Sequence, residues 1–551
     1  MRNLTNRFIL ALTFTALAFA GPAKVAKDLQ DLPAASWVDV IVQWTTPPGL
    51  AQHNKVSDRG GTLKQSFSIV RAGLYSIPAG AARGLANDPE VVYISPDRQH
   101  SAFLNVAAPT VNAPVAWQAG LDGSGMAVAV IDSGINPVDL NSALGASRIV
   151  YTEAFGGLTD GSDQFGHGSH VAGIIGNAGS ASNGTFKGIA PNVNIVNLRV
   201  LDANGSGQDS AVISAMQRAV QLKSTYNIRV INLSLGRPVY ESYTLDPLCQ
   251  AVEQAWNAGI VVVVAAGNTG RDNSQSTNGY GTIQAPGNDP YVITVGAMKT
   301  MGTVTRSDDL VATYSSKGPT LFDHIVKPDI VAPGNLMVSS LQKNTSLYGQ
   351  FPGNQVYLSS YTGANNNNAS SIFYKLSGTS MAAPVVSGAV ALLLQNNPSL
   401  TPDQVKARLM KTASKNFPQQ STATDPNTGI TYVSQYDVFT IGAGYLDIGA
   451  ALANGDLAAS SAMSPTATYD SASGNTYLVL GSNAIWGTNA IWGTNAIWGT
   501  NAIWGTNAIW GSNAIWGTST TQGFNAIWGT NAIWGTTSSS SALAVAIGGE
   551  N

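Results

Sequence analysis

Ser380 is the residue in this sequence whose surroundings best suit a nucleophile. It lies within Leu376–Pro384 (LSGTSMAAP), and the uncharged apolar run Val385–Leu394 follows. The pattern predicts a serine in the first turn of a buried helix, reached through a tight glycine turn. Unpaired backbone N–H groups and the positive end of the helix dipole meet at such a turn, so the serine could attack a carbonyl while they hold the oxyanion. The alternative is a helix-capping serine without chemistry, which is common.

Two closely spaced histidines, His167 and His170, lie in Phe165–Gly173 (FGHGSHVAG). The chain has five histidines, and His53 and His100 fall in the N-terminal segment. The spacing could place two metal ligands on one helix, but the Glu between them and the further ligand of a zinc helix motif are absent. The glycines on either side of His167 suit a general base at a helix start, where a substrate must come close.

An aspartate and an asparagine follow predicted buried strands. Asp132 lies in Val130–Gly134 (VIDSG), and Asn268 follows a valine-rich strand in Ala265–Thr269 (AAGNT). Either residue alone is typical of a turn. Beside a serine nucleophile, the side-chain amide of Asn268 would be a good oxyanion donor.

Apolar strands that alternate with helices must position these residues. Their continuous hydrophobic character predicts an α/β fold, with a parallel β-sheet flanked by helices on both faces. Active sites of such folds lie outside the carboxyl ends of the strands. Strands are predicted at 126–131, 194–201, 228–233, 260–266 and 292–297, and helices at 170–175, 209–222, 247–256 and from Thr401 onward. Residues 343–375, rich in Asn, Ser, Tyr and Gly, are interpreted as a surface insertion before the serine turn.

In chain order the motifs run Asp, His, Asn, Ser, and in this combination they resemble the subtilisin-like serine proteases, the subtilase family. The resemblance covers roughly residues 110–455 and implies the parallel sheet and flanking helices of that family. It implies that Asp132 orients the imidazole of His167 and that His167 is the general base for Ser380. Asn268 and the Ser380 N–H would form the oxyanion hole, and His170 would have a structural role.

Three short segments resemble the family's substrate-binding residues. They correspond to one wall of the primary specificity pocket, its opposite wall, and the strand edge that pairs with the substrate backbone. In that order they are Ser234, Leu235 and Gly236; Ala265, Ala266 and Gly267; and Gly205, Ser206 and Gly207. The resemblance implies no cofactor for catalysis. Family members often bind structural calcium, but no acidic cluster in the sequence allows a site to be assigned.

The N-terminal sequence and the composition indicate an exported protein without disulfides. Residues 1–20 place Arg2 and Arg7 before an apolar run that ends in AFA, a bacterial-type signal peptide too short to span a bilayer. No later stretch is expected to span a membrane, which predicts a secreted protein, extracellular or at the cell surface. The single cysteine, Cys249, excludes an intramolecular disulfide, and a net charge of -3 in 551 residues predicts no attraction to nucleic acid.

The N-terminal segment is expected to be a separate domain. Residues 21–105 predict a small α+β module, with strands at 38–44 and 90–96 and a short helix at 81–87. Val91–Pro96 (VVYISP) resembles part of the inhibitory propeptide of the family, which implies an intramolecular chaperone and inhibitor removed by self-cleavage near residues 100–108. The expected domains are then the signal peptide 1–20, the propeptide 21–105, the catalytic domain 106–455, a linker 456–480 and a repeat tail 481–551.

The tail repeats one short sequence. Asn-Ala-Ile-Trp-Gly occurs eight times from Asn483 onward, six of them in succession at a six-residue period, and no charged residue lies from Ser471 to Gly549. As a strand, each hexad would put Ala, Trp and Thr on one face. This favours surface binding or self-association, so the alternative to a protease is a secreted adhesin. A low-complexity tail that is disordered or aggregation-prone is the third interpretation.

Two other hydrolase classes fit less well. Ser380 lies in Gly-x-Ser-x-Ala rather than G-x-S-x-G, and the order of its partners differs from that of the α/β-hydrolases. Cys249 lies inside a predicted helix with no cysteine-protease motif around it, which favours a buried structural thiol. The sequence therefore predicts a secreted serine endopeptidase, made as a self-processed zymogen, that acts on polypeptides.

Overall fold

The computed structural model describes residues 24–30, 32–67, 70–97, 106–141, 145–274, 276–362, 366–425, 428–470, 475–479 and 550. The chain forms two compact units, residues 1–101 and 102–551. The predicted signal peptide and the Asn-Ala-Ile-Trp-Gly repeats lie outside the described residues.

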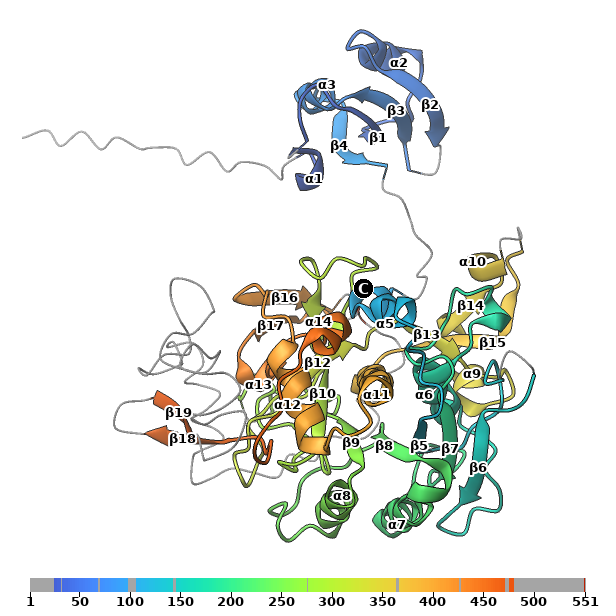
Figure 1. The fold of residues 1–551 in the computed structure, drawn as a ribbon. Coiled ribbons are helices and arrows are strands. Elements are labelled where there is room, and N and C mark those ends of the chain that lie inside the picture. Colours follow the sequence, from blue (N-terminus) through green and yellow to red (C-terminus); the bar gives the residue numbers. More distant parts are fainter. Residues whose placement is uncertain are drawn as a thin grey trace, which may run out of the picture. The chain divides into compact units, whose positions relative to one another are not determined.

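The first unit is a four-stranded antiparallel sheet in the order β2-β3-β1-β4, with short helices beside it (Figure 1). Val40, Val42 and Trp44 alternate along β1 and are buried with Tyr75 and Ile77 of β3, because alternate side chains share one face of a strand. The predicted strands and helix appear as β1, β4 and α3. The elements are α1 (Lys27–Gln30), β1 (Trp37–Trp44), α2 (Leu50–Ser57), β2 (Thr62–Phe67), β3 (Ala72–Pro78), α3 (Ala79–Leu85) and β4 (Val91–Pro96).

The second unit is built on an eight-stranded sheet that runs β11-β10-β9-β8-β5-β7-β6, with β12 paired to β10. Its strands are parallel except β11, which is antiparallel to β10, so the predicted α/β fold is confirmed with one antiparallel edge. Every residue of β5 and β9 is buried, which explains why both strands are apolar apart from Asp132 at the end of β5. The five predicted strands appear within two residues, as β5 (Ala127–Asp132), β7 (Asn194–Arg199), β8 (Ile228–Leu233), β9 (Val261–Ala265) and β10 (Ile293–Lys299). The sheet also contains β6 (Ile149–Ala154), β11 (Leu310–Val311) and β12 (Ile330–Pro333).

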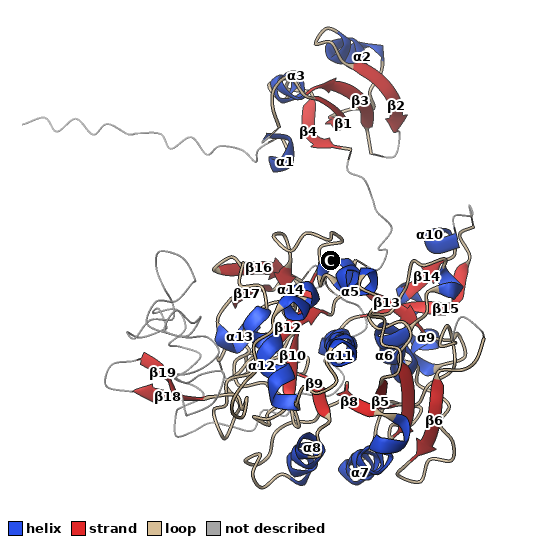
Figure 2. Cartoon of the chain, in the orientation of Figure 1, coloured by secondary structure: helices blue, strands red, loops and turns tan. Residues whose placement is uncertain are grey.

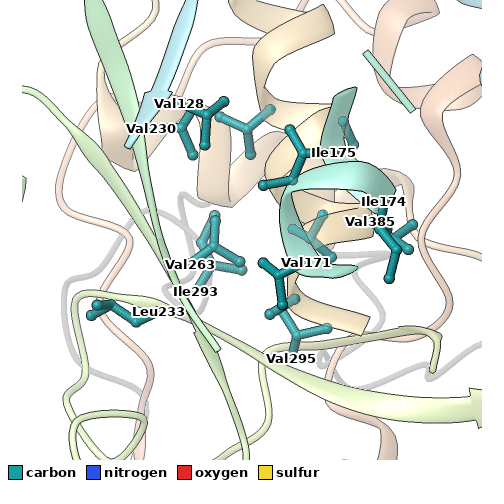
Figure 3. Close-up of a cluster of buried hydrophobic side chains, with 14 of the residues drawn as sticks. Val128, Val171, Ile174, Ile175, Val230, Leu233, Val263, Ile293, Val295 and Val385 are labelled. Carbon is teal, nitrogen blue, oxygen red and sulfur yellow. The ribbon is translucent and has the colours of Figure 1, made fainter. Parts of the chain in front are cut away.

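Helices cover both faces of this sheet (Figures 1 and 2). On one face α6 (His167–Gly176) packs against α11 (Thr379–Asn396), and on the other α7 (Asp209–Tyr226) packs against α8 (Pro247–Asn257). Branched side chains fill the layer between α6, α11 and the strands, and Figure 3 shows among them Val128, Val171, Ile175, Val230, Val263 and Val385. Burial of these side chains holds the starts of α6 and α11 against the sheet.

The sequence was expected to contain no segment beyond the signal peptide that could span a membrane, but α11 is long and apolar enough to be a candidate. Among the described residues it is the one helix long and apolar enough to do so by length and composition. However, 83% of it is buried inside the unit, where it packs against β8, β9, β10 and β12. Its apolar sequence is therefore that of a central core helix.

Residues 343–362 and 366–375, within the predicted surface insertion, are folded into the second unit, and most of them are exposed or half-buried. An antiparallel sheet in the order β13-β15-β14 contains them, formed by β13 (Met337–Ser340), β15 (Ala369–Leu376) and β14 (Gln355–Tyr357). Phe373 and Tyr374 are fully buried, and Phe373 packs on Phe186 outside the segment. The Asn- and Ser-rich composition hides this aromatic strand, which leads directly into the serine turn.

The remaining elements connect and close the second unit. The predicted capping box of α12 is present, because Thr401 Oγ1 accepts from the Gln404 N–H and Gln404 Oε1 accepts from the Thr401 N–H. The helices are α4 (Ala107–Thr110), α5 (Ala113–Gln118), α9 (Ser346–Gln350), α10 (Ser359–Thr362), α12 (Pro402–Thr412), α13 (Val438–Ile441) and α14 (Ile448–Ala453), with 3-10 turns at Ser180–Ser182 and Pro352–Asn354. Two hairpins pair β16 (Gln420–Thr424) with β17 (Thr431–Gln435) and β18 (Thr466–Asp470) with β19 (Asn475–Val479).

Candidate active site

Asp132 and His167 meet where β5 ends and α6 begins. His167 Nδ1 lies 2.8 Å from Asp132 Oδ1, and Asp132 is only 1% exposed. Since Asp132 accepts a hydrogen bond from Nδ1–H, the Nε2 atom is left to exchange a proton with another group. Burial lowers the pKa of His167, but the charge of Asp132 and its hydrogen bond raise the pKa, and the balance lies above the ordinary 6.5.

A second buried carboxylate, Asp163, holds the chain on both sides of this pair. Its oxygens accept hydrogen bonds from Ser133 Oγ (2.9 Å), from the Gly166 N–H (2.6 Å), and from the N–H and Oγ of Ser169 (2.8 and 2.6 Å). Ser133 also donates its N–H to Asp132 Oδ1 at 2.7 Å. Burial raises the pKa of Asp163 and these hydrogen bonds lower it, leaving it above 3.8. No sequence pattern predicted Asp163, because an aspartate four residues before a histidine carries no distinctive signal.

His170 lies one helical turn further along α6 and points away from this pair. Its Nε2 donates to the carbonyls of Met337 on β13 and Tyr374 on β15, at 3.0 and 3.1 Å. Burial lowers its pKa to about 3, so the ring is neutral and ties α6 to the small sheet. Among the described residues no group of three or more His, Cys, Asp or Glu side chains could hold a metal ion, so they give no location for structural calcium.

Ser380 is the second residue of α11, after a turn in which Gly378 is the helix cap with φ 145°, a value that favours glycine. The capping alternative for Ser380 is therefore wrong. Its Oγ donates to the Ser234 carbonyl at 2.9 Å, and Ser234 Oγ donates back to the Ser380 carbonyl at 2.8 Å. That carbonyl is open because Pro384, four residues on, has no N–H to give it. Ser380 and His167 are both described, and no hydrogen bond joins them.

The carboxyl end of β8 is also tied to α11 by the side chains of Asn232 and Ser387. Asn232 Nδ2 donates to Ser234 Oγ at 2.9 Å, and Ser387 Oγ donates to Asn232 Oδ1 at 2.8 Å. All three residues are buried. A satisfied buried network of this kind is rigid, so it fixes the strand end relative to the helix that carries Ser380.

Asn268 follows β9 and lies beside the same turn. Its Oδ1 accepts hydrogen bonds from the N–H of Thr379 at 2.9 Å and from the Thr379 hydroxyl at 3.1 Å. Thr379 Oγ1 in turn accepts from the Gly267 N–H at 3.1 Å. Asn268 Nδ2 has no hydrogen-bond partner in the part of the chain that the structure describes, so it is free to donate.

The two predicted walls of the specificity pocket follow β8 and β9, with Gln284 between them. Ser234 and Ala266 are buried, Leu235 is half-buried and Gly236 is exposed. A Cβ at Gly236 would lie 3.1 Å from Gln284 Oε1, and a Cβ at Gly267 would lie 2.8 Å from Gln284 Cγ. Gln284 was not predicted, and its N–H donates to the Ala266 carbonyl at 3.0 Å. The side chain of Gln284 therefore lies next to both walls.

The third predicted substrate segment begins in a turn and lies in none of the sheets that the structure describes. Gly205, Ser206 and Gly207 follow β7, and Asp202 Oδ1 accepts from the Ser206 N–H at 3.0 Å, which closes the turn. A Cβ at Gly205 would lie 2.6 Å from the Phe165 ring. The centre of that ring lies 6.4 Å from the centre of the His167 ring. Gly205 therefore lies beside Phe165, whose ring neighbours that of His167.

The thiol of Cys249 is outside this arrangement. It lies in α8, is fully buried and donates to Asn288 Oδ1 at 3.3 Å. Burial raises the pKa of Cys249, which keeps the thiol protonated and unreactive.

Known proteins resemble this chain in sequence. Residues 123–431 match the sequence profile of the Subtilase family. The chain is 34% identical over 379 residues to the serine protease AprX of Bacillus subtilis, covering 67% of this chain and 79% of that protein. It is 33% identical over 413 residues to subtilisin E of the same species, covering 74% and 92% of the two chains. It is 32% identical over 380 residues to an extracellular serine proteinase of a Thermus species, covering 65% and 75%.

The fold and these matches define a serine endopeptidase of the α/β class. The chain belongs to the subtilase family, and the resemblance drawn from its four motifs is confirmed.

Proposed function

We propose that Asp132, His167 and Ser380 form the catalytic triad of a secreted endopeptidase made as a zymogen. The observation that carries this proposal is the 2.8 Å hydrogen bond between His167 Nδ1 and the buried Asp132 Oδ1. It selects the tautomer whose Nε2 can take the proton of Ser380. Because the Ser380 hydroxyl rests on the Ser234 carbonyl, the reaction requires a rotation of that hydroxyl about its Cα–Cβ bond.

In the proposed reaction, Ser380 attacks a peptide carbonyl while His167 accepts its proton. The oxyanion accepts hydrogen bonds from Asn268 Nδ2 and from the Ser380 N–H, which lies in the first helical turn and has no acceptor within the helix. His167 then protonates the leaving amine, and water repeats the cycle on the acyl-enzyme. The unpartnered Nδ2 of Asn268 supports this role.

Polypeptide substrates are proposed to lie along the turn at Gly205–Gly207 and along Ser234–Gly236. One substrate side chain would enter between Ser234–Gly236 and Ala265–Gly267. The position of Gln284 beside both glycines, Gly236 and Gly267, supports a pocket whose depth this side chain limits.

The triad is tested with Ser380→Ala and a matched control, Ser210→Ala, which changes an exposed serine on α7. We expect Ser380→Ala to lower the rate of casein hydrolysis by on the order of 10⁴–10⁶. The control should retain the parent rate. Equal hydrolysis by both variants would contradict the proposed nucleophile.

The first unit is proposed to be the inhibitory propeptide, exported behind the signal peptide at residues 1–20. Its support is a separate hydrophobic core and the strand β4 formed by Val91–Pro96. In Ser380→Ala the junction near residues 100–108 should stay uncut, which intact-mass measurement of the secreted chain would show. If secreted Ser380→Ala instead has the same mass as the processed parent protein, self-processing is disproved. The casein test of the triad does not depend on this result.

The repeats motivate one further candidate function, binding to a surface or self-association. An in-frame deletion of residues 483–536 removes all eight repeats and keeps the residues that follow. If the repeats act in binding, this variant hydrolyses casein normally but loses cell-surface retention or changes oligomer size. Loss of hydrolysis would instead assign the repeats to the enzyme itself.

A further inference from the structure

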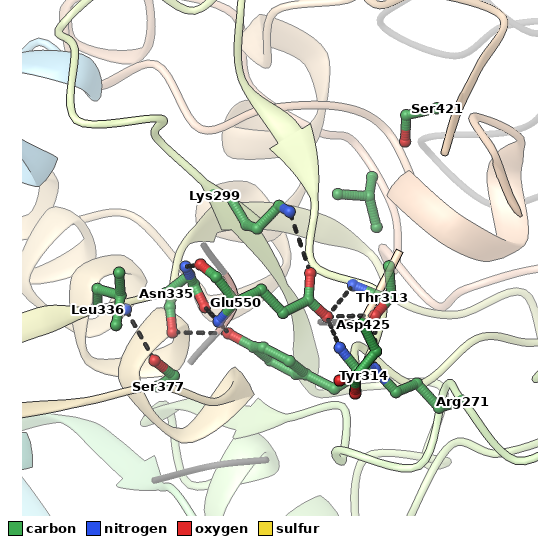
Figure 4. A network of polar contacts seen from close by, with 12 residues as sticks. Arg271, Lys299, Thr313, Tyr314, Asn335, Leu336, Ser377, Ser421, Asp425 and Glu550 are labelled. Carbon is green, nitrogen blue, oxygen red and sulfur yellow. Dashed lines mark hydrogen bonds and ion pairs between the residues drawn. The ribbon is translucent and has the colours of Figure 1, made fainter. Parts of the chain in front are cut away.

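Glu550 is bound inside the second unit, although 79 uncharged residues precede it. It is the first charged residue after Asp470, and it is only 8% exposed. Its carboxylate accepts hydrogen bonds from Arg271 Nη2 at 2.8 Å and from the Thr313 N–H at 3.0 Å, and a further one from the Thr313 hydroxyl (Figure 4). Lys299 Nζ lies 3.2 Å from the other carboxylate oxygen.

Asn335 binds the main chain of the same residue. Its Nδ2 donates to the Glu550 carbonyl at 2.7 Å, and its Oδ1 accepts from the Glu550 N–H at 2.9 Å. The site therefore contacts the backbone and the carboxylate of one residue together. Main-chain hydrogen bonds give affinity for any peptide, and the charged side-chain contacts select glutamate.

The positive charges of Lys299 and Arg271 are neutralised in part by the Glu550 carboxylate. The Lys299 side chain is 3% exposed, and Glu550 is the only ion-pair partner that the described residues give it. Arg271 has a second partner, Asp425, at 2.7 Å. With Glu550 the four charges balance, whereas without it a buried ammonium group would have no counter-ion, which is strongly destabilising. Burial raises the pKa of Glu550, but the Thr313 hydrogen bond and the charges of Lys299 and Arg271 lower it below 4.5, so the carboxylate is ionised at neutral pH.

We propose that Arg271, Lys299, Thr313 and Asn335 form a binding site for a glutamate within a peptide segment, and that Glu550 occupies it as an internal ligand. The occupied site anchors the far end of the tail to the catalytic domain. The segment before the tail is attached as well, because β18 pairs with β19 and bridges from Thr466 to Ile325. This inference concerns attachment, so it does not depend on the proposed triad.

The first test compares Glu550→Gln in the full chain with Glu153→Gln, which breaks the more exposed ion pair between Glu153 and Arg218. We expect Glu550→Gln to lower the apparent Tm by about 4–7 °C, because it leaves Lys299 buried and unpaired. The control should shift the Tm by less than about 1 °C. Equal Tm values for the two variants would overturn the proposal.

A second test asks whether the lower Tm of Glu550→Gln is caused by the unpaired Lys299. Adding Lys299→Met to Glu550→Gln should recover at least half of the lost Tm, because it removes the unpaired ammonium group. Hydrogen exchange gives a direct measure, since the Thr313 N–H donates to the Glu550 carboxylate. In Glu550→Ala this amide should exchange faster while the amides of β5 are unchanged. Unchanged Thr313 exchange, or a double variant less stable than Glu550→Gln, would rule out the site.

Discussion

Asn268 and Thr379 are joined by two hydrogen bonds that fix one end of the asparagine amide and leave the other open. The N–H and the hydroxyl of Thr379 both donate to Asn268 Oδ1, at 2.9 and 3.1 Å. The residue that precedes Ser380 in the chain therefore orients the proposed oxyanion donor. An amide held in this way needs no reorganisation when charge develops on the substrate.

Removing the open end of this amide should affect turnover more than binding. Asn268→Ala is expected to lower kcat on the order of 10²–10³ with little change in KM, because the oxyanion forms only after substrate has bound. Thr379→Val keeps one of the two bonds and should lower kcat about 2- to 10-fold. Thr379→Ser keeps both donors and serves as the control. A change confined to KM, measured on a fluorogenic peptide, would contradict the assignment.

As the pH is lowered, the activity should be lost at a midpoint above the ordinary pKa of a histidine. His167 must be neutral to accept a proton, and Asp132 raises its pKa above 6.5 despite burial. As the pH falls through this raised pKa, the ring is protonated and kcat/KM is lost, so the acid midpoint should lie above pH 6.5. In Asp132→Asn burial remains while the two contributions of Asp132 that raise the pKa of His167 are lost, so the residual activity should have its midpoint at lower pH. An unchanged midpoint in pH–rate profiles would show that Asp132 does not raise the pKa of the group that titrates.

Gln284 should limit which substrate side chain the proposed pocket accepts. Gln284→Gly removes the side chain that lies beside Gly236 and Gly267. The ratio of kcat/KM for peptides with a large aromatic side chain to those with a small one should then rise by about 10-fold. Gln419→Gly, on an exposed loop, is the matched control. The same ratio in both variants would place the pocket elsewhere.

Asp163 should contribute to stability through the four hydrogen bonds it accepts. Asp163→Asn replaces one acceptor oxygen with an NH₂ group that faces donors, which should cost about 1–3 kcal/mol of unfolding free energy. Asp308→Asn, at an exposed aspartate for which the described residues give no ion-pair partner, should have little effect. Urea denaturation in the Ser380→Ala background avoids self-digestion. Equal denaturation midpoints would show that the Asp163 network is not stabilising.

The strands of the second unit that could be predicted are those buried on both faces. Val261–Ala265 is a run of apolar residues because helices cover it above and below, and such a run is visible without knowledge of its neighbours. β6 is largely half-buried, so its sequence is not a continuous apolar run. β11 and β12 have only two and four residues, which is too short for a recognisable hydrophobic pattern. β15 was hidden by composition, since polar residues dilute its aromatic side chains.

The sequence pointed to the four motif residues of the proposed site because each stands near the end of a strand or the start of a helix. The residues that hold them could not be predicted, because they act through side chains from distant positions. Thr379 is 111 positions from Asn268, and Asp163 is 30 positions from Ser133. Glu550 is 279 positions from Arg271, and nothing in the uncharged sequence before it indicates a partner. Such pairs are set by topology, which a local pattern does not contain.

The long separations between bonded residues of the site also determine when the protein can act. The hydrogen bonds that assemble it join residues 35, 111 and 146 positions apart, and the last two need the start of α11 to be seated on β8 and β9. During synthesis, a chain that has not yet reached residue 380 lacks its proposed nucleophile even when β5 and α6 are complete. Proteolysis therefore becomes available only late in folding. The order of residues along the chain delays activity until the central helix is in place.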